Sequence, residues 1–161
     1  MDLGAGREVK LISHRGNISG PNTDRENSPE YLKEALDLGY DVEIDLWLME
    51  GSLFLGHDMF EYEISERYLN TIRDHAWIHC KNLLALDFCR RSDYYNCFSH
   101  SEDDAVLTSK GFIWAYPGKE IKSDKCIIVL PERGEQYKDL KIPKSFYGVC
   151  SDYIEQVNIV K

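Results

Sequence analysis

The sequence has no long apolar stretch and no segment that resembles a targeting signal. Its longest apolar runs, such as residues 126–130, contain five residues, whereas a membrane-spanning helix needs about 20. The first seven residues include two glycines and lack the apolar core of a secretory signal peptide. We therefore expect a cytoplasmic chain with no membrane span.

Disulfide and zinc-binding patterns are also missing. The chain has five cysteines, an odd number with no C-x-x-C pair, which fits neither a disulfide framework nor a zinc motif. They are Cys80, Cys89, Cys97, Cys126 and Cys150. The simplest interpretation is a reduced chain in which each cysteine is a small buried apolar side chain.

Positive charge is scarce, with 19 Lys and Arg residues against 28 Asp and Glu residues and a net charge of −9. This balance disfavours nucleic acid as a partner, because such binding depends on basic contacts with phosphates. Neither G-x-G-x-x-G nor a P-loop occurs, so no nucleotide-binding motif is present. With 43% hydrophobic residues over 161 positions, residues 1–161 are expected to form a single domain.

Strands and helices alternate along the chain. The clearest helix covers residues 29–38, since Ser28 suits the N-cap, Pro29 the first helical position and Gly39 the stop. Seven segments have strand character: residues 10–13, 41–48, 77–81, 96–100, 112–116, 126–130 and 147–151. Further helices are expected at residues 64–75, 83–91 and 103–109. This order predicts a parallel sheet, either closed as a barrel or open and doubly wound.

Two carboxylates stand on the second of these strands. Glu43 and Asp45 are two residues apart, so their side chains project from the same face of the strand. Two hard oxygen ligands in this arrangement suit Mg²⁺ or Ca²⁺. The alternative is an acidic edge strand that faces solvent, because charged residues are mostly exposed.

Two histidines are expected close to these carboxylates. A turn at residues 50–51 folds the chain back as a hairpin; a two-residue turn places His57 opposite Ile44, and a three-residue turn places it opposite Asp45. His14 ends the first strand, and active sites of parallel barrels collect at the carboxyl ends of strands. A histidine beside carboxylates and a cation can act as general acid or base. A surface histidine in a turn is the alternative for His57, and a structural histidine for His14.

Four short strings in this region carry a resemblance. They are HRGN at residues 14–17, EN at 26–27, EID at 43–45 and GHD at 56–58. In order and spacing they resemble the signature of the glycerophosphodiester phosphodiesterases, within the phosphatidylinositol-phospholipase-C-like phosphodiesterase superfamily. The resemblance is specific over residues 11–58 and weak or negligible beyond them.

The resemblance implies a TIM barrel that hydrolyses phosphodiesters with a divalent metal, Mg²⁺ or Ca²⁺. It implies His14 and His57 as the acid/base pair, Arg15 as a phosphate contact, and Glu43 and Asp45 as metal ligands. A neighbouring substrate hydroxyl would attack phosphorus and expel an alcohol, and water would then open the cyclic phosphate. The implied substrate is a small phosphodiester, either a glycerophosphodiester or a related lipid head group. A bound cation would also explain how a chain of charge −9 attracts an anionic substrate.

The third strand departs from the family pattern. The family usually has Glu where this chain has His79, whereas Lys81, expected near the phosphate, matches. His79 is either a metal ligand or a ring that packs in the barrel interior. With a histidine at this position, a barrel that binds phosphodiester or phosphate ligands with little or no turnover remains the alternative function.

Several further residues lie at strand ends. His100, Trp114 and Tyr116 could form the wall of a pocket, although such residues are more often found in the core or on the surface. Asp152, at the end of the last candidate strand, lies where the family that the motifs resemble often has an acidic residue, but capping of the following segment is the expected role.

The length limits the barrel. A TIM barrel typically takes about 250 residues, and the chain after Asp58 is too short to place a full helix after each of six further strands. We therefore expect a small, trimmed TIM barrel in which several outer helices are shortened or missing.

Overall fold

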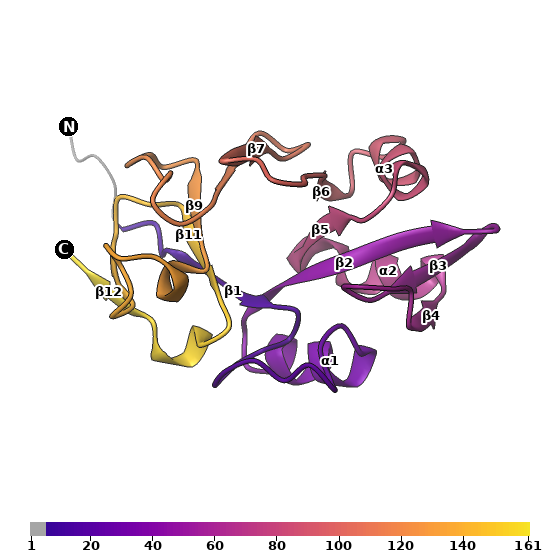
Figure 1. Cartoon of the computed structure of the whole chain (residues 1–161), viewed down its shortest axis with the longest axis horizontal. Helices are drawn as coiled ribbons and strands as arrows, with labels where there is room; N and C mark the ends of the chain where they lie inside the picture. The colour runs from indigo at the N-terminus through magenta and orange to yellow at the C-terminus, as the bar shows by residue number, and fades with distance from the viewer. Residues whose placement is uncertain (1–5) are drawn as a thin grey trace.

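The computed structural model describes residues 6–161 and shows one curled, mixed sheet of ten strands, a separate two-stranded sheet and three short α-helices (Figure 1). The strands are β1 (Lys10–His14), β2 (Asp41–Met49), β3 (Ser52–Leu55), β4 (Tyr62–Ile64), β5 (Ala76–Cys80), β6 (Asn96–Phe98), β7 (Ala105–Leu107), β8 (Ile113–Ala115), β9 (Cys126–Val129), β10 (Lys141–Pro143), β11 (Gly148–Ser151) and β12 (Asn158–Val160). The α-helices are α1 (Pro29–Asp37), α2 (Glu66–Ile72) and α3 (Leu83–Arg90), and three 3₁₀ turns are η1 (Arg73–His75), η2 (Pro131–Arg133) and η3 (Ile154–Gln156).

Seven parallel strands form the body of the large sheet, in the order β6-β5-β2-β1-β11-β9-β8. They correspond to the seven strand segments predicted from the sequence. The first part of β2 pairs with β1, and its later part pairs with the antiparallel hairpin strand β3. At the far edge, β7 pairs antiparallel with β8. The first and last thirds of the chain therefore meet at the centre of the sheet, where β1 lies between β2 and β11 (Figure 1).

The prediction of a TIM barrel is wrong. The sheet is a curled half-barrel of mixed strands with only three short helices in residues 6–161, and strand and helix do not alternate through it. The physical reason lies in the connections after β6. None of them contains an α-helix: the first returns as the antiparallel strand β7, and the one between β9 and β11 forms the 3₁₀ turn η2 and the strand β10. The two edge strands β6 and β7 do not pair with each other, so the barrel does not close. Only isolated hydrogen bonds join the segments beside them, such as that from the Ser109 N–H to the carbonyl of Cys97 at 2.8 Å.

The helices lie where the sequence carries strong local signals. In α1 the hydroxyl of Ser28 accepts a hydrogen bond from the Tyr31 N–H, Pro29 occupies the first turn and Gly39 follows the helix with φ +90°, which confirms the predicted helix. The predicted helix at 64–75 is shorter and comprises α2 and η1, and the one at 83–91 is α3. The predicted helix at 103–109 is wrong, because residues 105–107 pair with β8 as β7.

Apolar side chains alternate across the curled sheet and fill its concave side. In β9, Ile127 and Val129 pack with Trp77 and Trp114 inside the curl, whereas Ile128 packs on the other face. These rings and branched side chains form a floor below the carboxyl ends of the parallel strands. Polar residues at the strand ends therefore stand around a space whose base is apolar.

Two expectations from the sequence concern the state of the cysteines and the absence of a membrane-spanning helix. All five cysteines are buried and none forms a disulfide, as predicted. The longest α-helix in residues 6–161 has nine residues, and no helix there is long and apolar enough to cross a membrane.

Candidate active site

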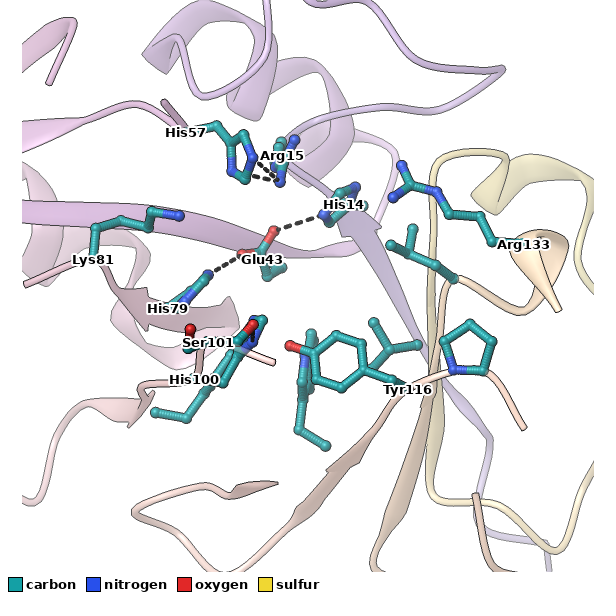
Figure 2. Close-up of a pocket in the computed structure, with 15 residues that line it drawn as sticks. His14, Arg15, Glu43, His57, His79, Lys81, His100, Ser101, Tyr116 and Arg133 are labelled. Carbon is teal, nitrogen blue, oxygen red and sulfur yellow. Dashed lines mark hydrogen bonds and ion pairs between the residues drawn. The ribbon is translucent and has the colours of Figure 1, made fainter. Parts of the chain in front are cut away.

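A cavity of about 660 Å³ opens at the carboxyl ends of β1, β2 and β5 (Figure 2). One wall is polar and one is aromatic. The polar wall contains His14, Arg15, Glu43, His57, His79 and Lys81, and the aromatic wall contains Phe98, His100, Trp114 and Tyr116. The structure thus brings all the predicted site residues around one cavity, with Asp45 directly behind Arg15 and His79.

Glu43 and Asp45 are buried, and the alternative of a solvent-facing acidic edge strand is wrong. Their side chains are 4% and 0% exposed, respectively, because β2 lies inside the sheet, between β1 and β5. Buried carboxylates need compensating partners. The two side chains must therefore be satisfied by their neighbours or by a cation.

His79 completes a group of three candidate metal ligands. It lies opposite Asp45 in the β2–β5 register, and one ligand atom from each of Glu43, Asp45 and His79 lies within 4.8 Å of the others. His79 Nδ1 is 3.0 Å from Oδ1 of Asp45 and 4.0 Å from Oε1 of Glu43. Among the described residues, Oε2 of Glu43 is buried without a hydrogen-bond partner, and Oδ1 of Asp45 has only Nδ1 of His79 close to it. Buried carboxylate oxygens around an imidazole nitrogen fit a divalent cation.

The two carboxylates differ in their readiness to ionise. Burial, and then the charge of Asp45, raise the pKa of Glu43 well above its usual value. Burial also disfavours the charged form of Asp45, but close contacts with His57 and His79 and the charge of Arg15 outweigh it and hold the pKa of Asp45 well below its usual range. Asp45 is therefore the permanent negative charge of the site.

His14 is oriented by a carboxylate from the other end of the chain. Its Nδ1 lies 2.6 Å from Oδ1 of Asp152, and its Nε2 points towards Oε2 of Glu43 at 3.6 Å. Asp152 also accepts hydrogen bonds from Asn17 at 2.9 Å and Arg133 at 3.1 Å. Burial opposes ionisation of Asp152, but its contacts with His14, Asn17 and Arg133 lower its pKa to about 2. Asp152 therefore stays ionised and holds His14 Nδ1 as a donor.

The expected capping role of Asp152 is wrong. The turn η3 that follows has Tyr153 at its N-cap position and no side-chain cap. The backbone N–H of Asp152 donates to Glu132 at 2.9 Å, which fixes the residue at the end of β11. The carboxylate is consequently free to face His14.

Arg15 links the carboxylates to His57. It leaves β1 with φ +59°, and its Nε lies 3.1 Å from Oδ2 of Asp45. Its Nη2 lies 2.6 Å from Nδ1 of His57. A guanidinium only donates hydrogen bonds, so a ring nitrogen of His57 accepts one from Arg15 only while it carries no proton. The cation and the ring therefore form one hydrogen-bonded unit at the mouth of the site.

His57 is positioned by a tight hairpin and a constrained glycine. The register Leu46 to Leu55 corresponds to the two-residue turn, and the Gly56 N–H donates to the Asp45 carbonyl at 3.1 Å. A Cβ at Gly56 would lie 1.9 Å from the carbonyl oxygen of Met59, so glycine is required there. Nδ1 of His57 comes to rest 3.7 Å from Oδ2 of Asp45.

Asn27 holds the remaining oxygen of Asp45. Its amide nitrogen donates to Oδ2 at 2.9 Å, and its amide oxygen accepts from the Asp45 backbone N–H at 2.9 Å. This double contact leaves Oδ1 of Asp45 facing His79. No role for Asn27 was predicted from the sequence, although its place in the EN string at 26–27 was a usable signal.

Aromatic rings and two cations complete the cavity. The His79 ring packs nearly parallel to both Phe98 and His100, at centroid distances of 5.3 and 4.3 Å, and His100 contacts Tyr116 at 4.6 Å. Lys81 points into the cavity from the end of β5, and Arg133 reaches it from η2 (Figure 2). Arg133 was missed because nothing in its loop sequence distinguishes it from a surface arginine.

Comparison with protein-family models, with curated proteins and with solved structures gives no match for this chain. What the cavity can do is therefore argued from its own residues. It combines a candidate metal group, a histidine backed by a buried carboxylate, and three cationic side chains, Arg15, Lys81 and Arg133. Such a set can hold an anionic group against a cation and move a proton beside it.

Proposed function

We propose that the chain is a metal-dependent phosphodiester hydrolase of the glycerophosphodiester phosphodiesterase type that its motifs resemble. The observation that carries the proposal is that the group Glu43, Asp45 and His79 shares one cavity with His14 and His57. The proposed substrate is a small phosphodiester with a hydroxyl next to the phosphate.

His14 is the proposed general base. Asp152 accepts from its Nδ1, which leaves the lone pair of Nε2 on the cavity side. This nitrogen can take the proton from the substrate hydroxyl that attacks phosphorus. Asp152 then acts through His14, as a positioning residue that also stabilises the protonated ring.

His57 is the proposed general acid. Its Nδ1 is engaged by Arg15, and its side chain is 40% exposed, so the ring can exchange protons with solvent. A phosphate that draws the guanidinium towards itself would release Nδ1 for protonation. The imidazolium formed in this way can give a proton to the leaving alcohol.

The cationic side chains compensate the charge of the reacting phosphate. Arg15, Lys81 and Arg133 approach the cavity from three directions and can contact phosphoryl oxygens as negative charge grows on them. A bound divalent cation would add further neutralisation and would lower the pKa of a hydroxyl that contacts it.

The test is hydrolysis of glycerophosphocholine and of bis(p-nitrophenyl) phosphate by the purified chain, with added divalent cation and with EDTA. Activity should require the cation and should fall by about 10²- to 10⁴-fold in His14→Gln and His57→Gln. His75→Gln is the matched control, because His75 lies outside the cavity. Phosphorus NMR should detect a cyclic phosphate with the glycerol diester. Full activity in both site variants would contradict the proposal, and metal-dependent binding without cleavage would favour a binding role.

A further inference from the structure

We infer that the metal site selects a later first-row transition cation, of the class of Co²⁺ and Zn²⁺, over Mg²⁺ and Ca²⁺. The inference rests on the cation site of the proposed function and names the class of metal that this site takes. It follows from His79, which places an imidazole nitrogen among the ligands.

The ligand set is one nitrogen and two carboxylates. Nδ1 of His79 faces Oδ1 of Asp45 and Oε1 of Glu43 at 3.0 and 4.0 Å. All three residues are more than nine-tenths buried, so water can compete poorly for these atoms. Oδ2 of Asp45 is taken by Asn27, and Oδ1 therefore remains for the cation on the same side as the imidazole.

The His79 ring cannot easily turn away from this position. It is nearly parallel to Phe98 and His100, with interplanar angles of 8° and 16°. Contact with both rings restrains the plane of the imidazole, and in that plane Nδ1 points at the carboxylates. Packing alone explains these ring contacts, but among the described residues it leaves Oε2 of Glu43 buried without a hydrogen-bond partner and gives Oδ1 of Asp45 only the imidazole nitrogen at 3.0 Å.

The donor atoms set the preference. Mg²⁺ and Ca²⁺ take oxygen ligands, whereas imidazole suits Zn²⁺ and other first-row transition ions. A carboxylate at position 79 would supply a third charged oxygen; the imidazole supplies a neutral nitrogen instead. Compared with a carboxylate, the imidazole attracts a hard cation such as Mg²⁺ less strongly and offers a borderline cation such as Zn²⁺ a ligand that it prefers.

Isothermal titration of the metal-free chain with Co²⁺, Mg²⁺ and Ca²⁺ tests the inference without any assay of activity. We expect Co²⁺ to bind at least ten times more tightly than Mg²⁺ or Ca²⁺. In His79→Glu the Co²⁺ to Mg²⁺ affinity ratio should shrink at least tenfold, whereas His75→Glu should leave it unchanged. Equal affinities in the native chain, or an unaltered ratio in His79→Glu, would overturn the inference.

A second measurement needs no variant and so does not depend on how His79→Glu folds. Pulsed electron paramagnetic resonance of the native chain loaded with Co²⁺ should show magnetic coupling to a directly bound nitrogen. Bound Co²⁺ without nitrogen coupling would overturn the inference, even if phosphodiesters are hydrolysed. Nitrogen coupling in a chain that cleaves no phosphodiester would support the inference and count against the proposed function.

Discussion

Oδ1 of Asp152 lies 2.6 Å from Nδ1 of His14, although 138 positions separate the two residues in the chain. The contact exists because β1 and β11 are parallel neighbours in which Ser13 stands opposite Ser151. The residues that follow these two serines, His14 and Asp152, therefore lie next to each other at the same edge of the sheet.

Replacing Asp152 should impair proton transfer without loss of the metal. Asp152→Asn removes the charge that orients His14 and stabilises its protonated form, so hydrolysis should fall by about 10²- to 10⁴-fold. In the pH–rate profile, the limb that reports the general base should be lost or shifted, an effect that a purely structural role would not produce. Asp139→Asn, at an exposed carboxylate, is the control. An unchanged pH profile in Asp152→Asn would refute the positioning role.

Stability should depend on pH through the same carboxylate. Asp152 has a folded-state pKa of about 2, lowered from 3.8, so its ionised form stabilises the fold above about pH 4. That contribution is lost as pH falls from about 4 to 2. The urea unfolding free energy of Asp152→Asn should therefore decline less than that of the native chain in this window. An equal decline of the unfolding free energy in the two proteins would show that ionised Asp152 does not stabilise the fold.

Asn27 should matter for metal affinity. It has φ +67°, a conformation that glycine adopts freely, so Asn27→Gly removes the amide that holds Asp45 without straining the backbone. Metal affinity should fall by about 10- to 100-fold, as for other groups that orient metal ligands. Glu50→Gly, at the exposed hairpin turn with φ +49°, is the matched control and should bind metal normally.

Gly56 should be intolerant of a side chain. In Gly56→Ala the new Cβ would clash with the backbone of Met59, and the loop that carries His57 must move. We expect a loss of hydrolysis larger than the loss of metal affinity, because the metal ligands lie on β2 and β5. Gly51→Ala, with φ +82° and open space around it, should be destabilised by about 1 kcal/mol or more and keep its activity. Equal activity in the two variants would contradict the placement of His57.

The features that the sequence predicted correctly have local causes. Ser28, Pro29 and Gly39 determine α1 through contacts within the helix and at its ends. The alternation in residues 41–48 places Glu43 and Asp45 on one face wherever the strand pairs. The position of His14 was predicted from the end of its strand, and that of His57 from the hairpin that follows the two carboxylates. These predictions needed little knowledge of distant segments.

The failures concern segments whose environment is set by distant parts of the chain. Residues 105–107 form β7 because β8 is available to pair with them, and nothing within the segment indicates it. Asp152 was interpreted as a cap because its partner, His14, lies at the other end of the sequence. The barrel was wrong for a related reason: whether a sheet closes depends on how its two edges meet, which strand patterns do not specify.

The central position of β1 divides the candidate site between two separate stretches of the chain. A nascent or shortened polypeptide that ends before β11 already holds Glu43, Asp45 and His79, since these lie on β2 and β5. It lacks the carboxylate that orients His14, and β1 has an open edge where β11 would pair. The proposed proton transfer therefore depends on the pairing of β11 with β1, whereas the candidate metal group does not.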